Sequence, residues 1–135
     1  MSLHSKITNA TIAYHSVLWF AHDDSGNIIV ADSCEGDVPC FVKSNLQNTE
    51  FLSQALCGIN AIAHTRVPPI DYQKLADMGF YCFQGDDYDS AVYHLRATPA
   101  TPVCLDDLDP AVKQILNTQK IPINVNTCQQ FRISP

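Results

Sequence analysis

The chain has 135 residues, a length that suits one domain and that can bury a core without a metal or a disulfide staple. Its formal net charge is −6, from 8 basic and 14 acidic residues, and no two basic residues are adjacent. This scatter argues against nucleic acid as a partner and against an anionic membrane surface, because both need clustered Lys and Arg. The longest apolar stretch, residues 17–21, is far too short to span a bilayer. We therefore expect a single domain over residues 1–135 and no membrane partner.

Residues 13–33 have the pattern of a β-hairpin, with strands at about 13–21 and 27–33. Two runs of apolar, β-branched and aromatic residues flank the polar break Asp-Asp-Ser-Gly. The break suits a type I turn whose last residue, Gly26, takes a positive φ without steric cost. Because both faces of the two strands are apolar, we expect this hairpin at the centre of a sheet or covered on both sides.

Three helices are predicted further along the chain. The longest spans about 49–63, where apolar residues recur at intervals of four, three and four positions. A short helix follows Asp71, which can cap it, and stops at Gly79. A second short helix opens with Asp109 as its cap and Pro110 at its first position. The apolar positions of the long helix are Leu52, Leu56, Ile59 and Ala63.

Residues 80–97 predict a second hairpin around the polar loop Gly-Asp-Asp-Tyr-Asp, and the weakly alternating tail predicts a terminal strand. The fold class is therefore α+β. We expect an antiparallel sheet built from two β-hairpins (about 13–33 and 80–97), with one long helix (about 49–63) and two short helices packed on it. This element order is similar to that of longin-like and roadblock-like regulatory domains, at the level of fold order alone.

Six cysteines are many for this length, and they favour two alternatives. Without a signal peptide, they are predicted to be reduced and mostly buried thiols in a cytoplasmic protein. In a secreted protein, the even count would permit three disulfides, and Asn9-Ala10-Thr11 would be a glycosylation acceptor. The cysteines are Cys34, Cys40, Cys57, Cys82, Cys104 and Cys128.

Three residues are candidates for nucleophilic catalysis: Cys40, His64 and His94. A cysteine becomes a nucleophile when a base or a positive environment favours its thiolate. Cys40 lies in a predicted loop and could meet either histidine in the folded chain. Phosphate-binding glycine loops and the Gly-x-Ser-x-Gly motif are absent from the sequence.

Three aspartates of the second hairpin, Asp86, Asp87 and Asp89, are candidate ligands for a hard cation. Counted from Asp87, however, the sixth and twelfth residues are Val92 and Thr98, so the spacing fails the calcium-loop pattern. We therefore expect a solvated hairpin tip, no bound metal and no cofactor. The nearest pair of cysteines is also too widely spaced for a structural zinc site.

The function predicted from these patterns is a small cytoplasmic binding or regulatory module that acts through self-association, as a homodimer, or through a protein partner. The low charged fraction of 16% and the wide apolar stripe of the long helix favour it. The apolar loop Val67-Pro-Pro-Ile70 either belongs to a partner surface or packs over the edge of the core. The alternative function is a small enzyme that uses a cysteine or carboxylate with a histidine in a pocket.

Overall fold

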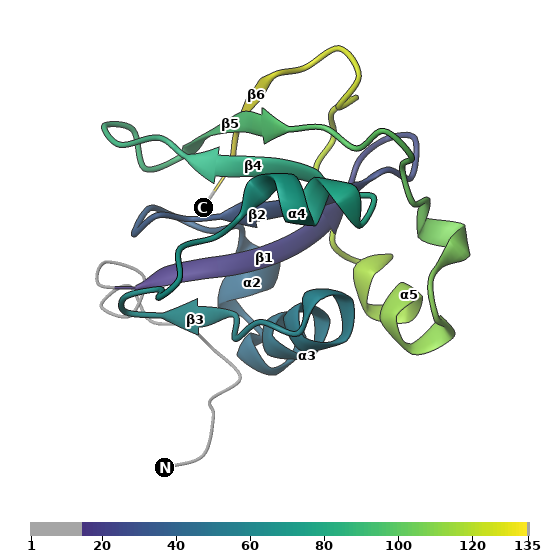
Figure 1. The fold of residues 1–135 in the computed structure, drawn as a ribbon, viewed down its shortest axis with the longest axis horizontal. Coiled ribbons are helices and arrows are strands. Elements are labelled where there is room, and N and C mark those ends of the chain that lie inside the picture. Colours follow the sequence, from purple (N-terminus) through teal and green to yellow (C-terminus); the bar gives the residue numbers. More distant parts are fainter. Residues whose placement is uncertain (1–14, 135) are drawn as a thin grey trace.

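A computed structural model describes residues 15–134, which form an α+β fold around one six-stranded mixed sheet of order β3-β1-β2-β4-β5-β6 (Figure 1). The strands are β1 (Ser16–His22), β2 (Ile28–Asp32), β3 (Ile62–Ala63), β4 (Tyr81–Gly85), β5 (Val92–Ala97) and β6 (Gln130–Arg132). The helices are α2 (Cys40–Lys43), α3 (Leu46–Cys57), α4 (Tyr72–Asp77) and α5 (Pro110–Leu116), with a 3-10 turn η1 at Leu105–Asp107. Residues 13 and 14 of the first predicted strand lie outside the described residues.

Both predicted hairpins are present, and they join through a parallel contact. Strands β1 and β2 pair antiparallel around Gly26, whose φ is 82°, and β4 pairs antiparallel with β5. Strand β2, however, pairs parallel with β4. A long connection carrying α3 and α4 separates these strands, so the chain re-enters the sheet from the same end. The sheet is therefore mixed and not wholly antiparallel.

The long helix begins and ends earlier than the predicted range of 49–63. The side chain of Asn45 caps α3 by accepting the backbone N–H of Asn48 at 2.9 Å. Gly58 adopts a left-handed φ of 67° and ends the helix, as glycine commonly does at this position. Residues 62–63, predicted as helix, instead pair with β1 as the edge strand β3.

The two short helices begin as predicted. The carboxylate of Asp71 accepts the backbone N–H of Lys74, and that of Asp109 accepts the N–H of Ala111. Pro110 occupies the start of α5, where its missing N–H costs nothing. Residues 40–43, between β2 and α3, form the single helical turn α2.

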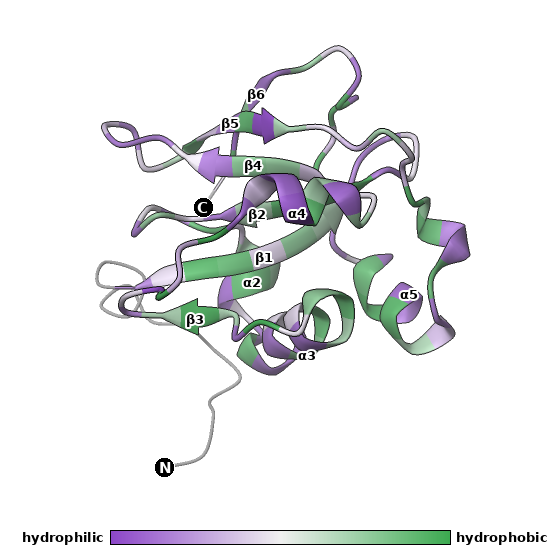
Figure 2. Ribbon diagram, viewed as in Figure 1, coloured by the Kyte–Doolittle hydropathy of each residue, from purple (hydrophilic) through white to green (hydrophobic). Residues whose placement is uncertain are grey.

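Each face of the sheet carries its own apolar core, and the central strands are coloured as hydrophobic in Figure 2. Residues of α3, α4 and α5 cover the face that holds Phe20 and Val30. The opposite face, centred on Trp19, is covered by residues 38–46 and by the C-terminal segment 121–133. The apolar residues on both sides of β1 and β2 are therefore covered within one chain. The tail contributes to this cover mostly as loop, with only β6 as the expected terminal strand.

The parallel pairing brings the ends of β2 and β4 to one edge of the sheet. The loop after β2, the tip of the β4–β5 hairpin and the segment between β3 and α4 all lie at this end of the molecule (Figure 1). Within residues 15–134, none of the helices has the length and apolar character needed to cross a membrane.

The buried Tyr93 hydroxyl generates a stability prediction. It accepts the indole N–H of Trp19 at 3.1 Å and donates to the backbone carbonyl of Asp37 at 2.5 Å. Tyr93→Phe leaves the buried Trp19 indole N–H and the half-buried Asp37 carbonyl without this hydrogen-bond partner, so we expect it to lower the free energy of unfolding by roughly 1–3 kcal/mol. Urea unfolding followed by tryptophan fluorescence measures this loss.

The matched control is Tyr88→Phe, because the side chain of Tyr88 is 99% exposed. It removes the same atom from a residue in contact with solvent, and we expect no change in the urea midpoint. Equal midpoints for the two variants would contradict the role given to the Tyr93 hydroxyl.

Candidate functional site

A groove of about 510 Å³ lies between the end of α3, residues 59–71 and α4. It exists because Gly58 ends α3 and turns the chain into β3, while Pro68 and Pro69 keep the following segment from forming a helix before Tyr72. Its volume is in the range of typical ligand pockets.

The lining of the groove combines apolar and polar groups in nearly equal share, and its rim is exposed. Ile59, Ile70 and Leu75 line the groove. Val67 is 87% exposed and Met78 38% exposed, which makes them two of the four large hydrophobic residues that the described surface exposes. The predicted apolar loop thus forms one wall of the groove, and its first residue projects into solvent.

Two basic side chains border the groove, Arg66 and Lys74. The Arg66 guanidinium donates to the backbone carbonyls of Asn60 and Ala61, both at 2.8 Å. Its Nε atom is buried and makes no hydrogen bond among the described residues. None of the ion pairs found within residues 15–134 involves Arg66 or Lys74. With Asp71 as the acidic residue of the lining, the groove has a net positive charge in an acidic chain.

A polar cluster lies beside the groove, where β2 and β4 end. It consists of Asp32 and Gln84, which are paired in register, together with Cys34 and Tyr72. The Asp32 carboxylate accepts the backbone N–H of Cys34 at 3.1 Å. Gln84 in turn accepts the guanidinium N–H of Arg96 at 2.9 Å. The cluster therefore connects the two parallel strands to α4 and to β5.

The backbone of the loop after β2 explains how the thiol reaches this cluster. Cys34 and Glu35 have positive φ values of 49° and 67°, which turn the chain sharply at the end of the strand. The turn brings Ser33 against β4, where a side chain on Gly85 would lie 2.3 Å from the Ser33 carbonyl. Only glycine fits at that position, and its N–H faces the Cys34 sulfur.

Burial raises the pKa of the Cys34 thiol, and the nearby Asp32 carboxylate raises it further. The side chains of Gln84 and Tyr72 act in the opposite direction and do not reverse the shift. Burial also raises the pKa of Asp32, with the N–H of Cys34 and the charge of Arg66 opposing it. At neutral pH, Cys34 is therefore a thiol rather than a thiolate, which makes it a weak nucleophile.

A second, smaller hollow of about 260 Å³ lies on the β4–β5 hairpin, lined by residues 84–88, His94 and Arg96. Here His94 Nε2 lies 2.7 Å from the Oδ1 atom of Asp86. Asp86 also accepts the backbone N–H groups of Tyr88 and Asp89, and these bonds, with His94, lower its pKa. The pair can orient an imidazole, and it also stiffens the hairpin tip.

The structure brings together two of the predicted site residues, His94 and Asp86, although they were predicted for different roles. Cys40 is exposed at the start of α2, which packs on the opposite face of the sheet from His94. His64 follows β3, where its ring contacts that of His15 at 5.5 Å. Asp87 is exposed, and Asp89 pairs with Arg132. Within the described part of the chain, no three His, Cys, Asp or Glu side chains gather as metal ligands.

The sequence interpretation missed the polar cluster and the basic side chains of the groove. Asp32 and Cys34 lie in a segment whose sequence predicts an ordinary loop, and Gln84 lies at the end of a predicted apolar strand. Only the parallel pairing of β2 with β4 brings them together. The apolar loop at 67–70 was the one signal that pointed to this region.

Comparisons with known proteins found no match to this chain among family models, curated proteins or solved structures. The functional argument therefore depends on the geometry of the chain itself.

The environment of Cys34 gives a prediction of thiol reactivity. Because the pKa of Cys34 is raised, we expect iodoacetamide to alkylate it more slowly than the exposed Cys40 at pH 8. We also expect the rate at Cys34 to keep increasing with pH at values above the usual thiol pKa. Asp32→Asn removes the negative charge but keeps an acceptor for the Cys34 N–H, so it should speed the reaction severalfold. Mass spectrometry of the alkylated peptides gives each rate.

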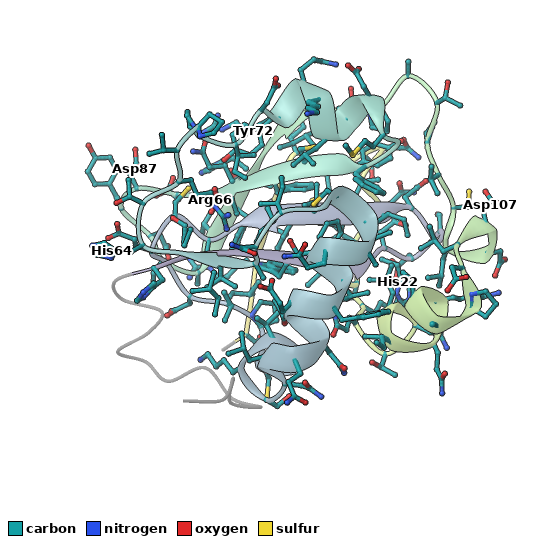
Figure 3. The ribbon with its side chains drawn as sticks, turned by 60° about the horizontal axis from the view of Figure 1, so that its bottom comes forward. His22, His64, Arg66, Tyr72, Asp87 and Asp107 are labelled. Carbon is teal, nitrogen blue, oxygen red and sulfur yellow. The ribbon has the colours of Figure 1, made fainter. Side chains whose placement is uncertain are left out.

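The matched control is Asp107→Asn, an equal loss of charge at the other end of the molecule (Figure 3). It should leave the rate at Cys34 unchanged. A Cys34 that reacts fastest of the six thiols would contradict the prediction, and it would favour the alternative of a cysteine enzyme.

Proposed function

We propose that this protein is a binding module that recognises a protein partner through the groove between α3 and α4. The partner presents an apolar or aromatic side chain flanked by carboxylates. The observation that carries the proposal is a groove of about 510 Å³, lined by apolar and polar groups together, with exposed apolar residues at its rim and basic side chains on its border. Exposed apolar surface rimmed by polar groups is typical of interaction sites.

The charge of the groove supports an acidic partner. Lys74 is exposed and has no carboxylate partner among the described ion pairs. Arg66 holds backbone carbonyls, so its charge is fixed in place beside the groove without being neutralised by an ion pair. A carboxylate near these groups gains attraction as the partner excludes water.

The exposed rim favours a protein chain over a small molecule. Val67 lies at the rim of the groove with 87% of its surface exposed. An occupant that fills only the hollow would leave Val67 in water, whereas a protein segment that extends past the rim would bury it. A protein is also a better candidate than nucleic acid, because the chain has 8 basic against 14 acidic residues.

A cytoplasmic location belongs to the same proposal. All six cysteines are free thiols, which persist where glutathione keeps thiols reduced. The alternative of a small enzyme has one observation in its favour, the imidazole of His94 held by Asp86 in a hollow. Cys34 is protonated at neutral pH and so supplies no ready thiolate, which leads us to favour the binding module.

A peptide titration tests the groove. The probe is an acetylated and amidated Glu-Glu-Phe-Glu peptide, followed by the backbone amide shifts of the ¹⁵N-labelled protein. We expect shifts to gather at Ile59, Val67 and Met78, and Lys74→Glu to weaken binding about tenfold or more, because it sets like charges against each other. In the cap of α4, Lys74 donates only its backbone N–H to the Asp71 carboxylate, so a change of its side chain should leave the fold intact.

The control variant is Lys43→Glu, the same change of charge on α2. It should bind the peptide as the wild type does. Control peptides replace the glutamates by glutamine, or the phenylalanine by alanine, and each should bind more weakly. Shifts scattered over the surface, or equal binding by Lys74→Glu and the wild type, would count against the groove as the recognition site.

A further inference from the structure

The tip of the β4–β5 hairpin carries the most exposed of the large hydrophobic residues of the described chain. Tyr88 is 99% exposed and lies between Asp87 and Asp89. A single exposed aromatic residue is common on protein surfaces, but a tyrosine placed among carboxylates has the chemistry that the groove accepts. We call residues 86–89 the acidic tip.

The acidic tip is held rigidly. Asp86 accepts the backbone N–H groups of Tyr88 and Asp89 at 2.9 and 2.8 Å, and His94 binds its other oxygen at 2.7 Å. Asp89 pairs with Arg132 of β6 and accepts the N–H of Ala91. These bonds hold the backbone of the tip in place, so the backbone would lose little entropy when the exposed Tyr88 side chain enters a partner.

The charges of the tip and the groove are complementary. Asp86 and Asp89 are paired with His94 and Arg132, whereas Asp87 is exposed and belongs to none of the ion pairs among residues 15–134. Asp87 is thus the carboxylate of the tip whose charge is available beside Tyr88. Lys74 has the corresponding position on the groove, exposed and outside those ion pairs.

The positions of the tip and the groove allow a reciprocal contact. Figure 3 places Asp87 of the tip and Arg66 of the groove toward one end of the molecule, with His22 and Asp107 toward the other. Figure 1 agrees, since the β4–β5 turn and the segment leading from β3 to α4 lie at the same edge. Two copies that face each other at this end can each present a tip to the groove of the other, which closes the assembly.

We propose that the groove receives Tyr88 of a second copy of this chain, with Asp87 of that copy beside Lys74, in a closed two-fold dimer. This inference rests on the proposed function, since it names the occupant of the same groove. Both requirements of the groove are met by one rigid segment of the chain, an aromatic side chain and a free carboxylate next to it. A two-fold arrangement forms each contact twice.

Sedimentation equilibrium of the full chain over micromolar concentrations tests the dimer. We expect the average mass to rise from 14.9 kDa toward twice that value as the concentration increases. Tyr88→Ala, Asp87→Lys and Lys74→Glu should each weaken the dimer about tenfold or more. The double variant Asp87→Lys/Lys74→Glu exchanges the two charges and should recover much of the lost association, which a merely structural effect would not do.

Asp107→Lys is the matched control for Asp87→Lys, because it makes the same change at the opposite end, and it should dimerise as the wild type does (Figure 3). A mass that stays at 14.9 kDa at every concentration overturns the inference, as does a dimer that none of the three single variants weakens.

The peptide titration separates the two proposals. If the chain stays monomeric but binds the acidic aromatic peptide in a way that depends on Lys74, the groove belongs to a different protein partner and only the second-copy inference fails. If neither the peptide nor a second copy binds, both proposals fail.

Discussion

The parallel contact between β2 and β4 is the constraint on which the rest of this structure depends. It joins two antiparallel hairpins into one sheet, and it requires the connection between them to cross one face. That crossing carries α3 and α4, which bury one side of the central strands. It also brings the ends of β2 and β4 together, so the loop after β2 packs directly against the start of the β4–β5 turn. Gly85, which has no room for a side chain beside Ser33, is the local consequence of this contact.

Features that depend on neighbouring residues could be predicted from the sequence. The turn at Gly26, the cap of Asp71 and the Asp109-Pro110 start of α5 each follow from the conformational preferences of a few consecutive residues. The end of α3 shows where prediction from neighbouring residues succeeds and where it fails. Apolar residues continue at helical spacing past Gly58, and the pattern alone extends the helix. The left-handed glycine and the pairing of Ile62 with Val17 determine the outcome, and the second of these is a long-range contact.

The candidate site could be predicted only in part, for the same reason. The sequence identifies the apolar segment that begins at Val67 as a candidate partner surface, and it identifies His94 and Asp86 as candidate site residues. Their direct contact follows from the hairpin register, which places His94 opposite Gln84 and two residues from the level of Asp86. The cluster around Cys34 needs the parallel register between β2 and β4, and no local pattern specifies that register.

The structure also changes the meaning of the acidic composition. Many of the carboxylates hold backbone N–H groups at turns and helix starts, and Asp23, although only 1% exposed, holds those of Ser25, Asn27 and Val125. The last of these bonds ties the C-terminal segment to the first hairpin, which helps that segment cover the second face of the sheet. The net charge of −6 thus comes in large part from carboxylates that hold turns and helix starts, so the total charge does not by itself locate a binding surface. What steers association is the local charge that these bonds leave available. Asp87 carries such a charge beside the exposed Tyr88, and Lys74 carries one on the groove whose rim exposes Val67.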